Sequence, residues 1–465
     1  MMLSVASRMD RAGFVAMEVI ATSHFKKCVR ELREDPWERI RLLAREIMKT
    51  PMAAMSGPHP PGGFGGFDTA PRAITNLWME RLAANGIRRV QIMEASNDMP
   101  RMEPAVRYAR TAGMQVVAAL VYSLSPKHTD TYYAQKAADA VKLHPDAVYL
   151  KDPGGLLTPE RVRTLVPAIL RSLGRTPFEL HSHCTTGLAP LCYLEALPLG
   201  VRTVHTAIPP LANGASQPSI FNVASNARVS GFAPAVDEEA VRPVAAHLSR
   251  LAQSRGLPAG EPLEYDCAQY VHQVPGGVIS NLKHQLSQIG MGDRLPEVLD
   301  ESVRVRRDLG YPIMVTPFSQ FVVAQAAMNV FAGARYAEIA DEIFKYALGF
   351  YGAEAGAGID PGVLGTIMDR PRAKELKSRT VPDLSIDEVR QTLGGPGVTD
   401  DELLLRYIMG GSAEIQHMRA AGPARGRAAD ASPLVQLIRG LVERPEISHA
   451  IIEGKGLSLE LRGPG

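Results

Sequence analysis

The chain has 465 residues, 45% of them hydrophobic, and a formal net charge of +2 from 51 lysines and arginines against 49 acidic residues. A chain of this length can bury a large core and should form two or three domains, whereas the balanced charge excludes nucleic acid or a membrane surface as the main partner. The longest apolar stretch, around Met114 to Leu124, is too short to span a bilayer, the N-terminus has no signal-peptide pattern, and the four cysteines form no CxxC pair. We therefore predict a cytoplasmic protein without membrane insertion.

Short apolar runs alternate with helical patterns through the first half of the chain, after an opening helical segment at Ser4 to Ala12. Helical patterns include residues 31–48, 71–84, 104–111 and 159–173, and strands are predicted near 15–20, 51–55, 89–94, 115–122, 147–151, 178–183 and 203–208. This alternation predicts an α/β fold, a TIM-type (β/α)8 barrel. Because such a barrel needs one strand more than these seven runs provide, its first strand is expected to be missing. Either a strand lies before Met1 or another element completes the barrel.

Beyond about Ala235 the sequence shows helical patterns without intervening strands, up to about Ala420. We predict that this region is an α-helical C-terminal domain packed near the barrel mouth. The predicted division is a barrel over residues 1–234, a helical domain over 235–421 and a tail over 422–465.

The tail begins with Gly422 to Pro433, which is rich in Ala, Gly, Arg and Pro, as is typical of a linker. A helix is predicted next, near Leu434 to Arg444. The chain then turns at Glu453 to Gly456 between two runs of β type, so we predict a hairpin that pairs residues 449–452 with 457–462.

Two segments carry candidate site residues at the ends of predicted strands, Lys151-Asp-Pro-Gly-Gly-Leu-Leu-Thr-Pro159 and Glu179-Leu-His-Ser-His-Cys-Thr-Thr-Gly187. The carboxyl ends of barrel strands form the catalytic face, and alternation places His181 and His183 on one side of their strand. Two such imidazoles commonly bind a divalent metal. Lys151 could join them only as a neutral amine or as a carbamate formed with CO2. Otherwise the histidines are hydrogen-bonded core residues, and Lys151 is a partner for phosphate or carboxylate.

These segments, in consistent order with several others, resemble the carboxyltransferase subunits and domains of biotin-dependent enzymes, namely pyruvate carboxylase, the oxaloacetate decarboxylase alpha subunit and transcarboxylase. The resemblance covers roughly residues 1–420. Its further segments are Glu34-Asp-Pro-Trp-Glu-Arg39, Thr206-Ala-Ile-Pro-Pro210, Ser216-Gln-Pro218, Val274-Pro-Gly-Gly-Val-Ile-Ser-Asn-Leu282 and Gly310-Tyr-Pro-Ile-Met-Val-Thr-Pro-Phe-Ser319.

The resemblance implies a role for each matching residue. Lys151 matches a carboxylated lysine that binds a divalent metal (Zn²⁺, Mn²⁺ or Co²⁺), and His181 and His183 match its imidazole ligands. Thr316 matches a threonine that shuttles a proton between substrate and biotin, and Ser319 matches a residue of the biotin pocket. Without the resemblance, Thr316 and Ser319 would indicate a Thr-Pro helix start with an N-capping hydroxyl.

The implied activity is carboxyl transfer between carboxybiotin and an enolisable acceptor, a 2-oxo acid such as pyruvate or oxaloacetate, with a metal that stabilises the enolate. Because the sequence has no Ala-Met-Lys-Met motif, biotin is expected on a separate carrier protein. A biotin carboxylase subunit and further copies of the chain are the other expected partners. Two alternatives stay open, a metal-dependent lyase or aldolase and a non-catalytic assembly subunit.

Three departures from the family pattern concern the site. The family's first strand, which carries an Arg-Asp pair with a metal-binding aspartate, has no match after Met1. The turn after the family's third strand holds an arginine for the oxo-acid carboxylate, but here Met55-Ser-Gly-Pro-His-Pro-Pro-Gly-Gly63 contains none. Lys26 stands where the family has an aspartate near the biotin pocket.

Some neighbouring residues could compensate for these losses. His59 could contact the acceptor or be a solvated loop residue. Glu94, with Asn97 and Asp98 after it, could support the metal or simply cap the next helix.

Overall fold

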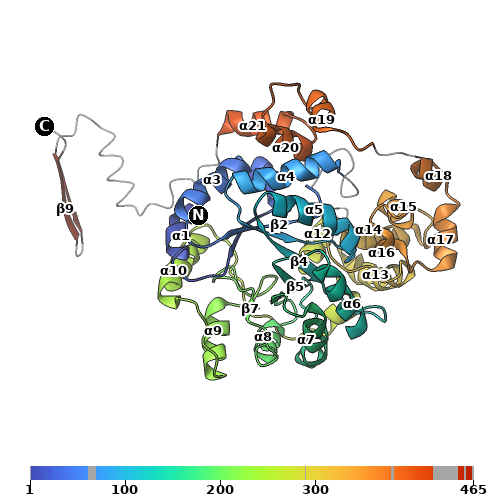
Figure 1. Cartoon of the computed structure of the whole chain (residues 1–465), viewed down its shortest axis with the longest axis horizontal. Coiled ribbons are helices and arrows are strands. Elements are labelled where there is room, and N and C mark those ends of the chain that lie inside the picture. Colours follow the sequence, from blue (N-terminus) through green and yellow to red (C-terminus); the bar gives the residue numbers. More distant parts are fainter. Residues whose placement is uncertain are drawn as a thin grey trace.

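The computed structural model describes residues 2–60, 70–288, 290–378, 382–422, 449–454 and 457–462. Its centre is a parallel sheet of seven strands that lie side by side in chain order (Figure 1). This arrangement confirms the predicted TIM-type α/β fold. The strands are β1 (Met17–Ala21), β2 (Met52–Ser56), β3 (Arg89–Ile92), β4 (Gln115–Val121), β5 (Ala147–Asp152), β6 (Phe178–Ser182) and β7 (Thr203–Val204).

The barrel is open on one side. Each strand pairs with the next one in the chain, but no pairing joins β7 to β1 within the described ranges. Strand β7 is shorter than predicted, since only Thr203 and Val204 pair with β6. A short strand at a sheet edge leaves few unpaired backbone groups exposed.

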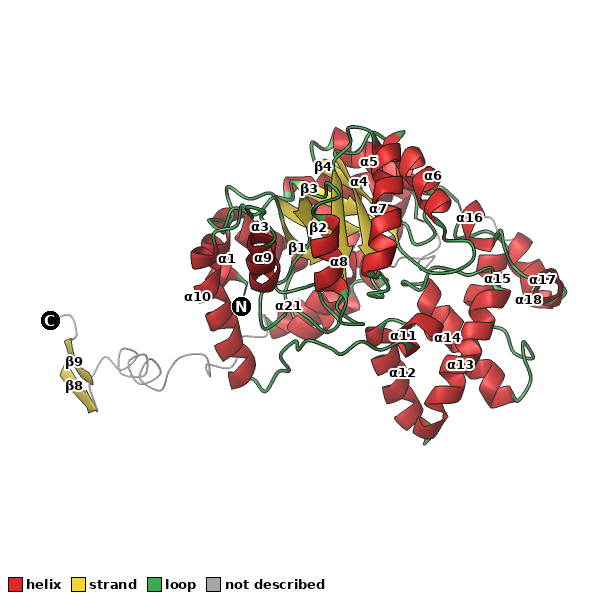
Figure 2. Cartoon of the chain, turned by 90° about the horizontal axis from the view of Figure 1, so that it is seen from below, coloured by secondary structure: helices red, strands yellow, loops and turns green. Residues whose placement is uncertain are grey.

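Helices cover the outside of the sheet (Figures 1 and 2). The predicted helices are found, although two begin elsewhere than expected. In chain order, these helices are α1 (Leu3–Met9), α2 (Thr22–Lys27), α3 (Pro36–Glu46), α4 (Arg72–Ala84), α5 (Met99–Thr111), α6 (Asp130–Val141), α7 (Pro159–Leu173), α8 (Ala189–Ala196), α9 (Ile220–Val229) and α10 (Glu238–Ser254).

The helix predicted over residues 31–48 is two elements in the structure. A π-helical turn, Cys28–Leu32, continues α2 and ends at Arg33, whose φ of 53° is left-handed. Helix α3 then starts afresh, because the Asp35 carboxylate caps the backbone N–H of Trp37 at 2.8 Å and Pro36 occupies a first-turn position, where its missing N–H costs no hydrogen bond. The Asp-Pro signal for this start was overlooked in the sequence.

The barrel core includes an aromatic cluster under α2, α3 and α4. Phe25, Trp37 and Trp78 are buried and meet edge to face, with ring centroids 4.8–5.5 Å apart. Aromatic pairs in this geometry are favourable beyond their buried area. The cluster therefore fixes the helices beside β1 and β2, next to the open side of the barrel.

The chain beyond α10 is helical, as predicted. Its first part forms a second apolar core, and its last three helices return to the barrel, where Asp401 binds Arg41 and Arg81 near α4 (Figure 1). The domain division stays a prediction. The helices are α11 (Ala268–His272), α12 (Gly276–Gln288), a 3-10 turn (Gly292–Arg294), α13 (Leu295–Asp308), α14 (Phe318–Ala332), α15 (Asp341–Ala347), α16 (Ala353–Gly356), α17 (Pro361–Met368), α18 (Pro371–Ser378), α19 (Ile386–Thr392), α20 (Asp400–Met409) and α21 (Ala413–Ala421).

The C-terminal hairpin is confirmed, with β8 (His449–Gly454) antiparallel to β9 (Leu457–Arg462). The predicted helix at Leu434 to Arg444 and the predicted linker after Gly422 lie outside the described residues. Within the described part of the chain, no helix has the length and apolar character needed to cross a membrane.

Candidate active site

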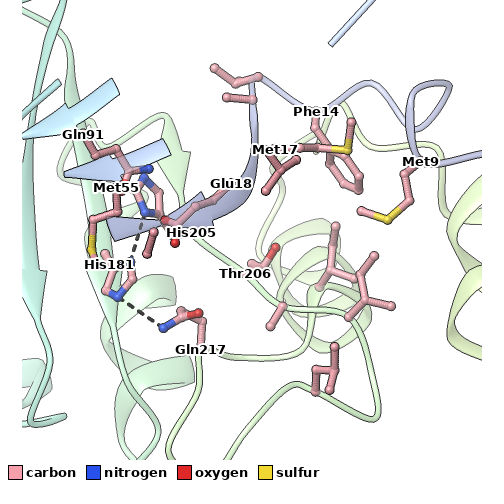
Figure 3. Close-up of a pocket in the computed structure, with 18 of the residues that line it drawn as sticks. Met9, Phe14, Met17, Glu18, Met55, Gln91, His181, His205, Thr206 and Gln217 are labelled. Atoms are coloured by element: carbon pink, nitrogen blue, oxygen red, sulfur yellow. Dashed lines mark hydrogen bonds between the residues drawn. The ribbon is translucent and has the colours of Figure 1, made fainter. Parts of the chain in front are cut away.

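The three predicted metal ligands come together at the carboxyl ends of β5 and β6. Lys151 and His181 are partners in the register of these strands, and His183 follows directly after β6. All three line one cavity of about 640 Å³, whose wall also includes β1 and the residues around β7. The cavity therefore lies at the open side of the barrel (Figure 3).

Burial favours the uncharged forms of all three side chains. It is the largest cause of the lowered pKa of Lys151, against which the Glu18 carboxylate acts in the opposite direction. Burial also brings the pKa of His181 well below its usual value and that of His183 to about 4, and the neighbouring Lys151 adds to both shifts. Neutral imidazoles bind metals, and a neutral amine is the form that reacts with CO2. The Lys151 ammonium has a poor partner here, since its Nζ donates to the thioether Sδ of Met55 at 2.7 Å.

His183 is oriented by the loop that faces it. Its Nδ1 lies 2.6 Å from the carbonyl oxygen of Ala215, so Nδ1 carries the proton and Nε2 keeps its lone pair. Gly155 packs against the backbone of the same histidine, where a Cβ would come within 2.6 Å of the His183 carbonyl oxygen. Gly155 also has a left-handed φ of 63°, so the tight turn after Lys151 requires glycine.

We expect Gly155→Ala to destabilise the protein and to displace His183. The left-handed φ alone costs about 1–2 kcal/mol for alanine, and the collision with the His183 carbonyl adds to this. Gly333→Ala is the matched control, because Gly333 has a left-handed φ of 64° but open space around it. Thermal unfolding should show a larger drop in Tm for Gly155→Ala than for Gly333→Ala. Equal drops would mean that the approach to His183 carries no strain.

A polar chain in the barrel interior leads from β3 to His181. Glu179 accepts hydrogen bonds from Arg89 through Oε1 and from His205 Nε2 through Oε2, the latter at 2.9 Å. His205 Nδ1 lies 3.0 Å from His181 Nδ1, and the Tyr149 ring stacks on His205 at a centroid distance of 5.4 Å. Burial would raise the pKa of Glu179, but His205 and Arg89 hold it below the usual value.

Sequence reasoning missed Arg89, Glu179 and His205. A signal was present, because Glu179 stands two residues before His181 and so shares its inward face. Polar residues at inward positions are unusual in a barrel whose interior is normally filled by branched apolar side chains.

The other predicted site residues lie outside this cavity. Thr316 is exposed just before α14, whereas Ser319 is fully buried in its first turn, with no hydrogen-bond partner for its Oγ among the described residues. The N-cap of α14 is Pro317 and has no side-chain cap bond, so the N-capping interpretation of Thr316 is wrong. Lys26 is half-buried on α2, and His59 is half-buried after β2, with its Nδ1 3.2 Å from the carbonyl oxygen of Pro60.

Glu94, Asn97 and Asp98 lie in the turn between β3 and α5. The Glu94 carboxylate accepts hydrogen bonds from the backbone N–H groups of Ser96 and Asp98, at 2.9 and 2.8 Å. The Asn97 side chain pairs with both backbone groups of Val121. These residues hold the entry into α5 and do not line the cavity. Asp98 is the N-cap residue of α5 but makes no side-chain cap hydrogen bond, so these residues order the turn before the helix and do not cap it.

Comparisons with known proteins divide the chain into two matched regions. The family model described as HMGL-like matches residues 3–247, and the conserved carboxylase domain matches residues 270–434. The chain is 36% identical over 370 residues to one of the pyruvate carboxylase subunits of Methanocaldococcus jannaschii, a match that covers 79% of this chain and 64% of that protein. It is 29% identical over 411 residues to the 2-oxoglutarate carboxylase large subunit of Hydrogenobacter thermophilus, which covers 87% of this chain and 62% of that protein.

A solved structure shows the same fold. The carboxyl transferase domain Y628A of Rhizobium etli pyruvate carboxylase, determined with pyruvate, superposes with a TM-score of 0.81 at 21% identity, and the match covers 92% of this chain and 74% of that one. By contrast, this chain spans less than two thirds of the length of both curated relatives.

Proposed function

This chain belongs to the HMGL-like family, and on that premise we propose that it is a biotin-dependent carboxyltransferase. It moves a carboxyl group between carboxybiotin and an enolisable 2-oxo acid. One observation carries the proposal, namely that Lys151, His181 and His183 line a single cavity at the carboxyl ends of neighbouring barrel strands. The relatives named as carboxylases support the reaction class.

The residues present fit a divalent metal. Three nitrogen donors share the cavity, and burial favours the neutral form of each. The neutral Lys151 amine can add to CO2 and lose one proton, which converts it into a carbamate oxygen donor. When bound, a Zn²⁺, Mn²⁺ or Co²⁺ ion would polarise the acceptor carbonyl and stabilise the enolate. No group of three His, Cys, Asp or Glu side chains that could hold a metal occurs among the described residues, so Lys151 is essential to the set.

The remaining roles stay predictions. Ser319 has a buried hydroxyl with unused hydrogen-bonding capacity, which suits a residue of the biotin pocket. A proton shuttle at the exposed Thr316 requires biotin and acceptor to meet between α14 and the Lys151 cavity. The acceptor is proposed only as a class, because the relatives are named for two different 2-oxo acids, pyruvate and 2-oxoglutarate.

The proposed partners follow from the reaction. A biotin carboxyl carrier protein would present carboxybiotin, and a biotin carboxylase subunit would charge it, in the cytoplasm and together with further copies of this chain. Relatives whose names mark them as subunits support such an assembly.

The test is oxaloacetate decarboxylation by the purified chain, with and without free biotin, in parallel with its metal content by elemental mass spectrometry. We expect about one equivalent of metal and pyruvate formation that depends on biotin. Carbon–carbon cleavage without biotin would instead identify a lyase or aldolase. A metal-loaded chain that is inactive on oxaloacetate and on carboxylated 2-oxoglutarate would identify a non-catalytic assembly subunit.

A further inference from the structure

The polar chain Arg89–Glu179–His205–His181 has no evident structural benefit. Arg89 and Glu179 are both buried, and a buried ion pair is often no more stable than an apolar pair of the same volume, because both charges lose their hydration. The pair also crosses the barrel interior, since β3 and β6 are not neighbours in the sheet. Its effect is to place a carboxylate directly behind His205.

The backbone holds His205 firmly at this place. Its N–H donates to the carbonyl oxygen of Leu180 at 2.9 Å, and its carbonyl oxygen accepts from the Tyr193 hydroxyl at 2.7 Å. With the Tyr149 ring stacked on one face, the imidazole has little freedom to rotate. The ring is therefore a rigid link between Glu179 and His181.

Proton positions along this link follow from its two ends. Glu179 forms an ion pair with the Arg89 guanidinium through Oε1, so its Oε2 is an acceptor, His205 Nε2 carries a proton and His205 Nδ1 is left as an acceptor. His181 Nδ1 must then donate across the 3.0 Å contact. The opposite end agrees, since the Gln217 amide donates to His181 Nε2 at 3.2 Å (Figure 3). In the Nε2–H tautomer of His181, two lone pairs would face each other in the contact with His205 Nδ1, and two N–H groups would face each other in the contact with Gln217.

We propose that His205 is a positioning residue that fixes His181 in the Nδ1–H tautomer and so keeps His181 Nε2 deprotonated, as a metal ligand must be. The metal part of this inference rests on the proposed function. His183 reaches the same state differently, through the Ala215 carbonyl. Ligand histidines usually donate their second ring N–H to a carboxylate or carbonyl group. Here a second histidine, with Glu179 behind it, relays that interaction.

The experiment measures tautomer and metal affinity separately. In the metal-free protein labelled with ¹⁵N-histidine, long-range ¹H–¹⁵N correlation spectra should show His181 as the Nδ1–H tautomer and His205 as the Nε2–H tautomer. Co²⁺ is then titrated into the wild type, His205→Ala and His205→Asn, with binding followed by calorimetry and visible absorption. His247→Ala is the control, since this half-buried histidine bonds to Ser4 away from the site.

We expect His205→Ala to weaken Co²⁺ binding about 10–100-fold and to release His181 from the Nδ1–H tautomer. His205→Asn, whose neutral amide oxygen can accept from His181 Nδ1 without placing a second carboxylate beside Glu179, should restore both. Unchanged affinity in His205→Ala, or an Nε2–H tautomer for His181 in the wild type, would overturn the inference. A wild type that has the expected tautomer but binds no Co²⁺ would refute the metal part together with the proposed function, while the tautomer assignment would stand.

Discussion

Replacing Lys151 by alanine should reduce biotin-dependent carboxyl transfer by about 10³-fold or more, because the enolate would lose its main electrostatic stabilisation. Among the described residues that line the cavity, Lys151 is the only one that can become an oxygen ligand by reacting with CO2, and the two histidines alone do not complete a metal site. The variant should therefore also lose its metal. Steady-state rates and metal content, measured on the same preparation, would show both losses together.

Lys136→Ala is the matched control for this substitution. Lys136 is as buried as Lys151, with 7% of its surface exposed, but it pairs with Glu354 at 2.7 Å away from the cavity. The Lys136→Ala variant should be less stable than the wild type, but its rate of carboxyl transfer per folded molecule should not be lower. Labelling with ¹³C-bicarbonate should give a carbamate signal in the wild type and in Lys136→Ala only. Full activity in Lys151→Ala would refute the carbamate assignment, whatever the metal content.

The sequence predicted what depends on local periodicity. Lys151 and His181 were found because each ends an apolar run, and neighbouring parallel strands bring such ends to one edge of the sheet. The hairpin and the order of the strands were predicted for the same reason, since turn residues and alternation are local signals.

Contacts across the barrel could not be predicted in this way. Arg89 and Glu179 are 90 residues apart and meet only because the curved sheet turns both side chains inward. His205 follows a strand that was predicted too long, so its position could not be inferred from alternation. Thr316 was identified only by its resemblance to the family. The matching sequence around α14 did not determine whether the Thr316 hydroxyl would reach the Lys151 cavity.

Acidification should destabilise the metal-free protein strongly between pH 6.5 and 5. Burial, the largest cause, lowers the pKa of His128 to about 3 and that of His183 to about 4, whereas both would titrate near 6.5 in the unfolded chain. Below pH 6.5 the unfolded state thus takes up protons that the folded state refuses, and the free energy of unfolding falls as the pH falls. Each histidine contributes about 1.4 kcal/mol per pH unit over this range.

Together the two groups would remove about 4 kcal/mol by pH 5, a large part of the 5–15 kcal/mol that typically separates folded from unfolded states. Urea unfolding in the presence of a chelator, at several pH values from 7.5 to 5, measures this slope directly. His128→Asn with His183→Asn should reduce the slope even if the double variant is less stable at pH 7.5, and His181, whose pKa is also lowered by burial, should account for a remaining slope. The exposed His417→Asn should leave the slope unchanged. A double variant with the slope of the wild type would mean that other groups govern the acid sensitivity. With metal bound, the free energy of unfolding should fall more steeply at the acid end, because protons would also compete with the ion for His183.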